Sequence, residues 1–481
     1  MINVKTKSHK LGRQNKSSLN SKQRGSWMRL IFVVIAVFMI SPAFAQILIE
    51  GTIKDKETKE GIPFAHVFVE GTATVAVSDI DGVFVISVPK EEANIKMVIS
   101  SVGYDNYEQT PADIQAKGTK EFLLESAVFD LDVAVVRSPE KVLNDALSKL
   151  EENYWSEPFM VEGFYRKGAL ENDKFSFLTE AMIQYYSKGY HRSDKTTIDI
   201  NIVQLRNSED FRQVKLSQHN NPIYLALYNY DKVKSRNIWQ TLEKAKVGSA
   251  TMEVSAYNGE SIYIVNLNGL KIYVGFDNSK IYRIDTKAGK RGTGSSFQYR
   301  EYKGKLYPFY FRIKNFTRDG KKLGKKMMTY YKGQDIKAIA DSLAELSIVD
   351  APLDKRARMV ERKSRQIMTR ISQEILRDSD VDLIGFIQEF VATNITIKSE
   401  EKYKIETNMV KNLEIFETEV YYDFDFWNNY QLPDKSKYLQ EIKANLEEAG
   451  NGKPLDQQFD EVGRKNNENN KKFSKRMKKE K

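Results

Sequence analysis

The hydrophobic residues of this chain change period along its length, and each change predicts a different element. From residue 47 to about 136, short runs alternate apolar and polar residues with Gly, Pro and Asp between them, which is typical of half-buried antiparallel strands. In the run "PFAHVFVEG" this alternation sorts the side chains onto two faces, with Phe64, His66, Phe68 and Glu70 on one and Ala65, Val67 and Val69 on the other. The pattern predicts an antiparallel β-sandwich over residues 46–130.

The period lengthens in "SPEKVLNDALSKLEENY", which predicts one amphipathic helix within residues 131–157. Ser138 can cap this helix and Pro139 suits its first turn. Its apolar stripe would be formed by Val142, Ala146, Leu147 and Leu150. We expect this linker helix to join the sandwich to the next part of the chain.

Residues 158–334 return to the alternation of strands and are rich in Tyr and Phe. The dipeptide Asn268-Gly269 separates two alternating runs, which predicts a two-residue hairpin, and a second turn is expected at Asp277-Asn278-Ser279. We interpret this part as an antiparallel, aromatic-rich meander, either an open sheet or one curved into a half-barrel.

Helical spacing returns after residue 335. The runs "DIKAIADSLAEL", "DKRARMVERKSRQIMTRISQEILRD" and "KYLQEIKANLEEAG" are typical of helices, with a mixed stretch before Tyr430. Residues 335–463 are therefore predicted to be helical or mixed, and the polar, low-complexity residues 464–481 to be a disordered basic tail. The expected fold class is mainly β with α.

The net charge of +10 comes from the two ends of the chain. Residues 1–45 hold eight Lys and Arg and no acidic residue, and residues 464–481 hold nine basic against two acidic, so the residues between them carry about −5. A nucleic-acid groove lined with Lys and Arg is therefore not supported. The chain contains no Cys, which excludes disulfides, thiolate metal sites and a lipid-modified cysteine.

The basic N-terminal end has the composition of a secretory signal. Arg29 precedes an apolar run of 11 residues, which Pro42 and the sequence Ala43-Phe44-Ala45 follow. Such a run is too short to span ~30 Å of hydrocarbon as a helix. We expect residues 1–45 to be a signal peptide cleaved before Gln46, with Met28 as an alternative initiator and an uncleaved anchor as the alternative reading. Cleavage would leave no transmembrane segment and would place the protein in the periplasm or at the outer membrane.

The stretch "AVSDIDGVFVISVP" has two aspartates before a glycine, as a calcium loop does. With Gly82 at the sixth position of an EF-hand loop, however, Val77 would occupy the first position and Val88 the twelfth, where carboxylate ligands are needed. We therefore interpret the stretch as a tight turn between strands, in which Asp accepts backbone N–H groups and Gly82 adopts a positive φ.

The other candidate residues form no catalytic constellation. His66, His191 and His219 lack the spacing of a zinc site, and no G-x-S-x-G elbow or Walker loop occurs. The glycine-rich "GKRGTGSS" lacks the strand-to-helix context of a phosphate loop and is expected to be a hairpin loop. Acidic pairs such as Glu400-Glu401 and Glu447-Glu448 are uninformative among 65 acidic residues. We predict no catalytic residue, no cofactor and no metal site, and hence no enzyme.

Three other features could contact a partner. The helix expected over residues 354–378 carries eight Lys and Arg, among them Lys355, Arg356, Arg358, Arg362, Lys363, Arg365 and Arg370, around an apolar stripe. This would suit either an anionic lipid surface or an ordinary solvated face. The aromatic meander could form a trough for a hydrophobic ligand, or its aromatic side chains could be buried under helices. The basic tail could touch a membrane peripherally.

Several segments, in order, resemble the carboxypeptidase-like regulatory domain, namely "GTIKD" at Gly51, "IPFAHVFVEGT" at Ile62, "SDIDGVFVISVP" at Ser78 and "ISSVGY" at Ile99. The resemblance covers about residues 47–125. It implies a transthyretin-like β-sandwich, common in exported proteins of Gram-negative bacteria and often placed before TonB-dependent outer-membrane receptors. The domain is non-catalytic in this family, so the resemblance assigns no functional residue.

The rest of the chain is similar to an uncharacterised extension of such proteins, through "LNDALSKLEENYWSEPFMVEGFYRKG", "FLTEAMIQYY" and "DFDFWNNYQLP". The meander "YIVNLNGLKIYVGFDNSKIYRID" also resembles the half-barrel of periplasmic lipoprotein carriers. A receptor barrel of about 22 strands would not fit beside the sandwich and the helices.

These observations lead to three hypotheses about function. The first is a non-enzymatic interaction or scaffold module of the cell envelope, which meets a protein partner at the outer membrane. The second is a periplasmic carrier for a lipid or another hydrophobic ligand, which requires a dry trough of useful volume. The third is a hydrolase of unrecognised type.

Overall fold

The computed structural model describes residues 46–127, 137–190, 198–213, 231, 233–234, 250–286, 294–318, 381, 383–397, 420–430 and 437–479. From Ile47 onward these residues belong to one compact unit, which is mainly β with helices, as predicted. Several predicted features lie outside the described residues, namely the signal peptide, the helices over 335–346 and 354–378, most of the loop that begins at Gly289, and the pair Glu400-Glu401.

The N-terminal part is the predicted sandwich of two small sheets. One sheet has the order β4-β1-β7, formed by β1 (Gln46–Asp55), β4 (Val83–Pro89) and β7 (Glu121–Leu124). The other has the order β3-β2-β5-β6, formed by β2 (His66–Val69), β3 (Val75–Val77), β5 (Met97–Ser100) and β6 (Tyr107–Gln109). The short helices η1 (Lys90–Glu92) and α2 (Pro111–Lys117) connect strands. The sandwich is not wholly antiparallel, because β1 and β7 pair in parallel through a long connection that contains α2.

Strand β2 contributes its two faces to two different cores. Ala65, Val67 and Val69 are fully buried inside the sandwich. Phe64 and Phe68, on the opposite face, pack against the core of the larger sheet described below. The predicted alternation is therefore correct, and it marks a strand that lies between two layers of apolar residues.

The segment "SDIDG" is the predicted turn between β3 and β4. The Asp79 carboxylate accepts the backbone N–H groups of Asp81 and Val83, each at 2.9 Å. Gly82 has a φ of +80°, and a Cβ there would lie 2.4 Å from the carbonyl oxygen of Ile53. Glycine is therefore required by both conformation and space.

The predicted linker helix is present in two pieces, α3 (Pro139–Ser148) and α4 (Leu150–Asn153). Ser138 Oγ accepts the backbone N–H of Lys141 at 3.2 Å, and Pro139 is the first helical residue, as expected. The helix is interrupted at Lys149, whose φ of −93° and ψ of 17° depart from helical values.

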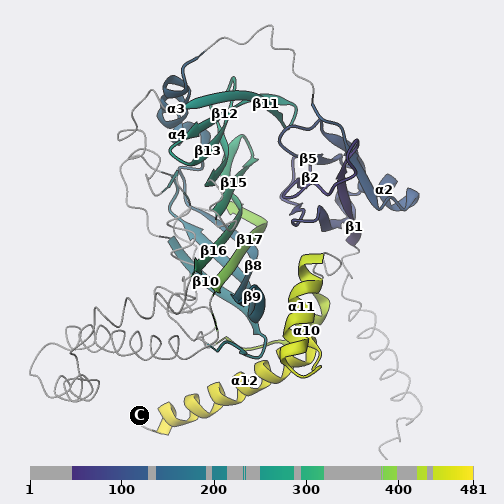
Figure 1. Ribbon diagram of the computed structural model, residues 1–481, viewed down its shortest axis with the longest axis vertical. Helices are drawn as coiled ribbons and strands as arrows, with labels where there is room; N and C mark the ends of the chain where they lie inside the picture. Colours follow the sequence, from purple (N-terminus) through teal and green to yellow (C-terminus); the bar gives the residue numbers. More distant parts are fainter. Residues whose placement is uncertain are drawn as a thin grey trace, which may run out of the picture. The chain divides into compact units, whose positions relative to one another are not determined.

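A ten-stranded antiparallel sheet forms the larger part of the structure (Figure 1). Its order is β10-β9-β8-β17-β16-β15-β14-β13-β12-β11. The strands are β8 (Phe159–Glu171), β9 (Lys174–Ser187), β10 (Ile198–Asn207), β11 (Thr251–Tyr257), β12 (Glu260–Leu267), β13 (Leu270–Gly275), β14 (Ile281–Thr286), β15 (Gly294–Tyr302), β16 (Lys305–Arg318) and β17 (Leu383–Ile397). Both predicted turns are confirmed, with positive φ at Asn268, Gly269 and Ser279.

Strand β17 corrects the predicted boundary at residue 334. Residues 335–463 were expected to be helical or mixed, yet β17 pairs with β16 on one side and with β8 on the other, inside the sheet. Strand β8 is separated from β17 along the chain by eight intervening strands of the same sheet, β9 to β16, so their pairing is a long-range contact that no local pattern reveals.

Three helices follow the sheet: α10 (Phe424–Asn429), α11 (Lys437–Ala449) and α12 (Leu455–Lys479). The second matches its prediction. The third shows that the prediction of a disordered tail from residue 464 is wrong, because α12 continues through Lys479. Its first half is anchored by Phe459 and Gln458, both buried, and by the Asn467 amide, which donates to the Tyr422 carbonyl oxygen at 2.9 Å. Among the described residues, no helix has the length and apolarity needed to cross a membrane.

Candidate functional site

A single row of polar side chains crosses all ten strands of the large sheet. Residues that pair directly on neighbouring antiparallel strands point to the same face. The register places in one line, from β10 to β11, Arg206, Glu180, Arg166, Glu389, Arg312, Ser296, Asp285, Lys271, Asn266 and Thr251. The charges of the first five members alternate in sign. We call this line the cross-strand row.

The closed half of the row consists of Arg206, Glu180, Arg166 and Glu389. Glu180 Oε1 accepts from Arg166 Nε at 2.6 Å, and its Oε2 accepts from Arg206 Nε at 2.7 Å. The side chain of Glu180 is only 3% exposed. Burial opposes ionisation of this carboxyl, but the two guanidinium groups prevail and lower its pKa.

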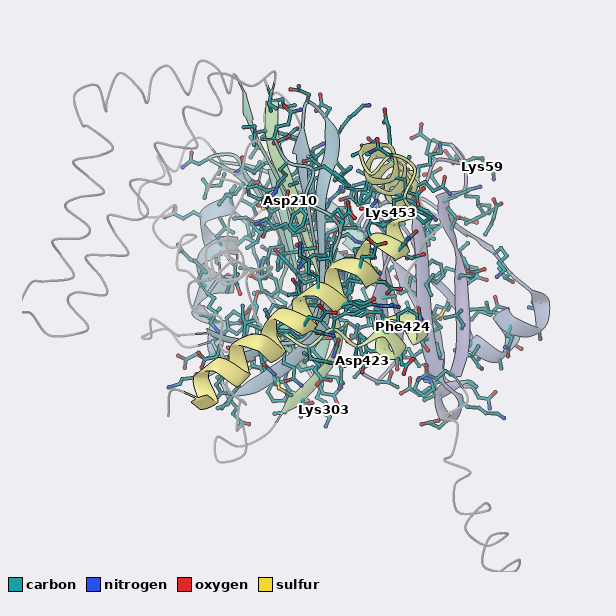
Figure 2. The ribbon with its side chains drawn as sticks, turned by 90° about the horizontal axis from the view of Figure 1, so that it is seen from below. Lys59, Asp210, Lys303, Asp423, Phe424 and Lys453 are labelled. Atoms are coloured by element: carbon teal, nitrogen blue, oxygen red, sulfur yellow. The ribbon has the colours of Figure 1, made fainter. Side chains whose placement is uncertain are left out.

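The C-terminal helices cover the closed half. The guanidinium of Arg206 lies 4.4 Å from the ring centroids of both Trp427 in α10 and Phe459 in α12. Tyr422, just before α10, donates from its hydroxyl to Asp460 of α12 at 2.5 Å. Figure 2 labels Asp423 and Phe424, where this segment runs beside α12. Aromatic faces therefore replace water over these charges.

Arg312 lies where the two halves meet. Its Nε is 3.4 Å from Glu389 in the closed half. Its guanidinium lies 5.3 Å from the ring centroid of Phe64 in the sandwich and 5.2 Å from that of Tyr438 in α11. The "SDIDG" turn of the sandwich also contacts Tyr438, because Asp81 Oδ2 accepts the backbone N–H of Tyr438 at 3.2 Å. One side chain thus contacts sandwich, sheet and helix.

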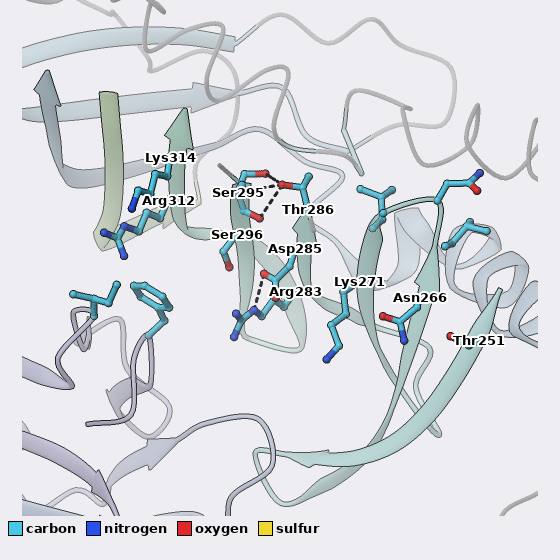
Figure 3. A pocket seen from close by; sticks show the side chains of 17 residues that line it. Thr251, Asn266, Lys271, Arg283, Asp285, Thr286, Ser295, Ser296, Arg312 and Lys314 are labelled. Atoms are coloured by element: carbon cyan, nitrogen blue, oxygen red, sulfur yellow. Dashed lines mark hydrogen bonds and ion pairs between the residues drawn. The ribbon is translucent and has the colours of Figure 1, made fainter. Parts of the chain in front are cut away.

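The open half of the row lines a cleft of about 830 Å³ between the sheet and the sandwich. Figure 3 shows its polar side chains on neighbouring strands, with Arg312 and Lys314 at one end and Asn266 and Thr251 at the other. The sandwich contributes Phe64 and Ile80 to the lining. The hairpin between β12 and β13 contributes Leu267 and Leu270.

Positive charge predominates in the lining of this cleft. Lys271, Arg283, Arg312 and Lys314 are cationic, and Asp285 is the single carboxylate among the lining residues. Asp285 is already occupied, since it accepts from Arg283 Nε at 2.8 Å and from the Tyr273 hydroxyl at 3.0 Å. Lys271 pairs with Glu253 at 3.3 Å, where both side chains are about half exposed.

Lys314 differs from the other three cations. It contacts the ring of Phe316 at 5.0 Å, but no described carboxylate forms an ion pair with its amine. Burial, followed by repulsion from Arg312, lowers the pKa of this amine, although Asp173 and Glu441 attract the charge from farther away. Within the described part of the chain, the charge of Lys314 in this cleft is therefore not compensated by an ion pair.

His66 is the one predicted candidate histidine that lies within the described residues. Its Nδ1 accepts from the Tyr257 hydroxyl at 2.7 Å and its Nε2 contacts the amide oxygen of Gln298, which corresponds to a neutral ring protonated at Nε2. Burial lowers the pKa of His66 to about 3, and Arg300 and Arg283 act in the same direction against the hydrogen bond to Gln298. His66 is a packed histidine in the contact between sandwich and sheet.

Sequence reasoning did not find a second group of reactive residue types. Lys234 Nζ contacts Ser187 Oγ, and Asp231 accepts from the hydroxyls of Tyr190 at 2.7 Å and Tyr299 at 2.5 Å. Burial lowers the pKa of Lys234 to about 8 and raises that of Asp231. Ser187 is fully buried in the core, and its hydroxyl also accepts the backbone N–H of Gly189 at 3.0 Å. Ser187, Asp231 and Lys234 therefore lie together in the interior of the described structure.

The aromatic side chains of the meander fill the core of the sheet. Phe297 and Phe311 stack at 6.0 Å, and Tyr299 meets Tyr154 edge to face at 5.2 Å. Phe64, which comes from the sandwich, is the one aromatic residue that lines the large cleft. Over the part of the chain that the structure describes, no three His, Asp or Glu side chains stand close enough to hold a metal ion.

Comparison with known proteins identifies the sandwich. Residues 49–136 match the family model described as CarboxypepD_reg-like domain, which confirms the resemblance found in the sequence. The comparison with curated proteins gave no match. Among solved structures, the chain is similar to a DUF1329 family protein from Desulfovibrio piger, with 11% sequence identity, 37% of this chain and 86% of that chain covered, and a TM-score of 0.19. A likeness of this size carries no argument about function.

Proposed function

We propose that this protein is a non-enzymatic, exported binding module of the cell envelope, and that it holds its ligand in the cleft between the regulatory-like sandwich and the ten-stranded sheet. The observation that carries the proposal is that the C-terminal helices cover one half of the cross-strand row and leave the other half open. Half of the row is sealed by helices and fully paired, while the other half lines about 830 Å³ of open space. A cleft of this size is typical of ligand sites.

Export is supported by the sequence before Gln46, which has the charged, apolar and small-residue regions of a signal peptide. The absence of catalysis is supported by the state of the reactive side chains that are described. His66 is held neutral between Tyr257 and Gln298, and Ser187 is enclosed in the core.

Native mass spectrometry of the protein, purified gently from the envelope of its own cells, tests the proposal. We expect a chain that starts at Gln46 and that carries an additional small mass, which is lost on collisional activation. The variant Ser296→Trp should lose this mass, because its indole would occupy the cleft. The variant Ser87→Trp should retain it, because Ser87 is exposed on β4 of the sandwich. A bare wild-type chain found in the cytoplasm would contradict the proposal.

A protein partner at the outer membrane is the second candidate. The observation that favours it is a group of exposed apolar side chains next to the edge strand β10, namely Val203, Tyr421 and Phe424, which are 42%, 61% and 44% exposed. The backbone N–H of Asp423 donates to Gln204 Oε1 at 3.2 Å, which holds the group together. The same spectra would show such a partner as a second polypeptide, and Ser296→Trp would leave it bound.

A carrier for a purely apolar ligand has less support, because the lining of the cleft is charged and the aromatic side chains of the meander are packed against one another. A ligand without any polar group would leave Lys314 and its neighbours buried without solvent.

A further inference from the structure

We propose that the cleft along the open half of the cross-strand row binds an amphipathic organic anion, whose carboxylate, phosphate or sulfonate group lies at Lys314 and Arg312 and whose apolar part lies on Leu270 and Ile80. This inference rests on the proposed function and specifies the chemistry of the ligand. It follows from the charge, the apolar lining and the size of the cleft.

The charge of the cleft calls for an anion at one end. Lys314 has no ion-pair partner among the described residues, and Arg312 shares Glu389 with the Tyr310 hydroxyl, which donates to the same carboxylate at 3.1 Å. Figure 3 shows Lys314 and Arg312 side by side on β16. An anionic group placed there would accept charge-assisted hydrogen bonds from both side chains. It would also relieve the repulsion between them.

Two further polar groups of the cleft, those of Ser296 and Lys271, have only weak contacts among the described residues. The Ser296 hydroxyl receives a single long contact of 3.4 Å from Gln298 Nε2, and Ser296 lies between Arg312 and Asp285 in the row. Lys271 is engaged in an exposed pair with Glu253, which contributes little and can be exchanged for a stronger interaction. The Ser296 hydroxyl and the Lys271 amine can therefore form hydrogen bonds to a bound anion with little loss of folding free energy.

The apolar lining requires a ligand with a hydrophobic part. Leu267 and Leu270 flank the hairpin turn at Asn268-Gly269, and Ile80 projects from the "SDIDG" turn of the sandwich. Ile80 is 46% exposed, although it is large and apolar. Leu267 is already buried, so a ligand would cover mainly Leu270 and Ile80, at about 25 cal/mol for each Å² removed from water. A volume of about 830 Å³ exceeds that of a single inorganic ion and suits an organic molecule.

Two related fluorescent probes distinguish the contribution of the ligand's charge to binding from that of its apolar part. The first is 1-anilinonaphthalene-8-sulfonate, and the second is N-phenyl-1-naphthylamine, which lacks the sulfonate. We expect the full mature chain to bind the sulfonate at one site, at least tenfold more tightly than the uncharged amine. The affinity should fall as the salt concentration rises, because the interaction is ionic. Equal affinity for the two probes would overturn the inference and favour a carrier for apolar ligands.

A matched pair of variants locates the site. Lys314→Gln should weaken binding of the sulfonate about tenfold, as expected for the loss of one charge-assisted hydrogen bond. Lys117→Gln makes the same charge change at an exposed position on α2 and should leave binding unchanged. Circular dichroism and thermal unfolding of both variants show whether the fold is intact. Equal affinities of the two variants would place the probe elsewhere and overturn the assignment.

Competition distinguishes a lipid source from a free phosphate. Displacement of the sulfonate by lysophosphatidic acid, but not by glycerol 3-phosphate, would support an anionic lipid as the ligand. Displacement by both at similar concentrations would support a soluble phosphate, and displacement by neither would overturn the proposed chemistry. If native spectra show a neutral or cationic small ligand, the proposed function stands and this inference fails. If they show no ligand, the proposed function itself fails.

Discussion

The closed and open halves of the cross-strand row contain similar side chains on the same face of one sheet, and they differ in what covers them. In the closed half, Glu180 has two guanidinium partners, and Trp427 and Phe459 lie over Arg206. In the open half, Asp285 and Lys271 have partners that are partly solvated. Lys314, which lies beside the row on β16, has no ion-pair partner among the described residues. The register places polar side chains across the whole sheet, and the C-terminal helices bury the charged ones of the closed half.

The difference between the two halves shows how a binding site can be recognised without any catalytic motif. Charged groups removed from water must be paired, as in the closed half, or they destabilise the folded state. A half-buried cation in an open cleft, without an ion-pair partner among the described residues, is therefore a candidate site for a bound anion. The predictions below test whether the two halves behave differently when the same type of change is made in each.

The largest effect on the free energy of unfolding is expected from Glu180→Gln in the closed half. The variant leaves Arg166 and Arg206 buried without their shared carboxylate, and breaking such a network typically costs about 3–5 kcal/mol. Urea titration of the mature chain should show this loss in the free energy of unfolding. Because the pKa of Glu180 is lowered in the folded state, its contribution is fully present above the ordinary pKa of a glutamate and is lost as the pH falls through the folded value. A loss below about 1 kcal/mol would mean that the closed half is hydrated.

An intermediate effect on the free energy of unfolding is expected from the titration of His66, which lies between the sandwich and the sheet. Its pKa is about 3 in the folded protein, whereas the ordinary value is 6.5. The unfolded chain therefore binds a proton between these values and the folded protein does not, so the stability falls as the pH is lowered through this window. The expected loss is about 1.6 kcal/mol between pH 6.5 and pH 5.

The variant His66→Gln isolates this contribution, because it keeps a hydrogen-bonding group at the position and removes the titration. Urea titrations of both proteins at several pH values should show curves that converge as the pH is lowered from 7.5 to 5. Parallel curves would show that His66 is protonated in the folded protein. That result would mean that water enters the contact between Tyr257 and Gln298.

Features determined by neighbouring residues were predictable from the sequence. The Asp79 and Gly82 turn, the Asn268-Gly269 hairpin and the Ser138 cap each depend on a few adjacent residues whose conformational preferences are strong. The assignment of the β2 side chains to two faces was also predictable from the sequence, because a strand buried on both sides still has two distinct faces. Its second apolar face, Phe64 and Phe68, indicated a further layer of protein.

The cross-strand row and the cleft were not predictable, because both depend on register between distant strands. Arg166 meets Glu389 through a pairing of β8 with β17, and no local pattern reports it. The run "LIGFIQEFVATNITI" did carry a signal, since it is rich in β-branched and aromatic residues. The helix α12 was missed for another reason: polar composition suggested disorder, while contacts of its first half with Tyr422 stabilise a helix that the composition also permits.

The smallest effect on stability is expected from Glu253→Gln in the open half, which makes the same chemical change as Glu180→Gln. Glu253 pairs with Lys271 at 3.3 Å, and their side chains are 57% and 41% exposed, so the loss should stay below about 0.5 kcal/mol. Its effect on binding should have the opposite sign, because Glu253 competes with the anion for Lys271. The affinity for 1-anilinonaphthalene-8-sulfonate should therefore rise about twofold. Glu108→Gln, which removes the exposed partner of Lys96 in the sandwich, should leave that affinity unchanged. A loss of stability as large as that of Glu180→Gln would show that the two halves of the row do not differ.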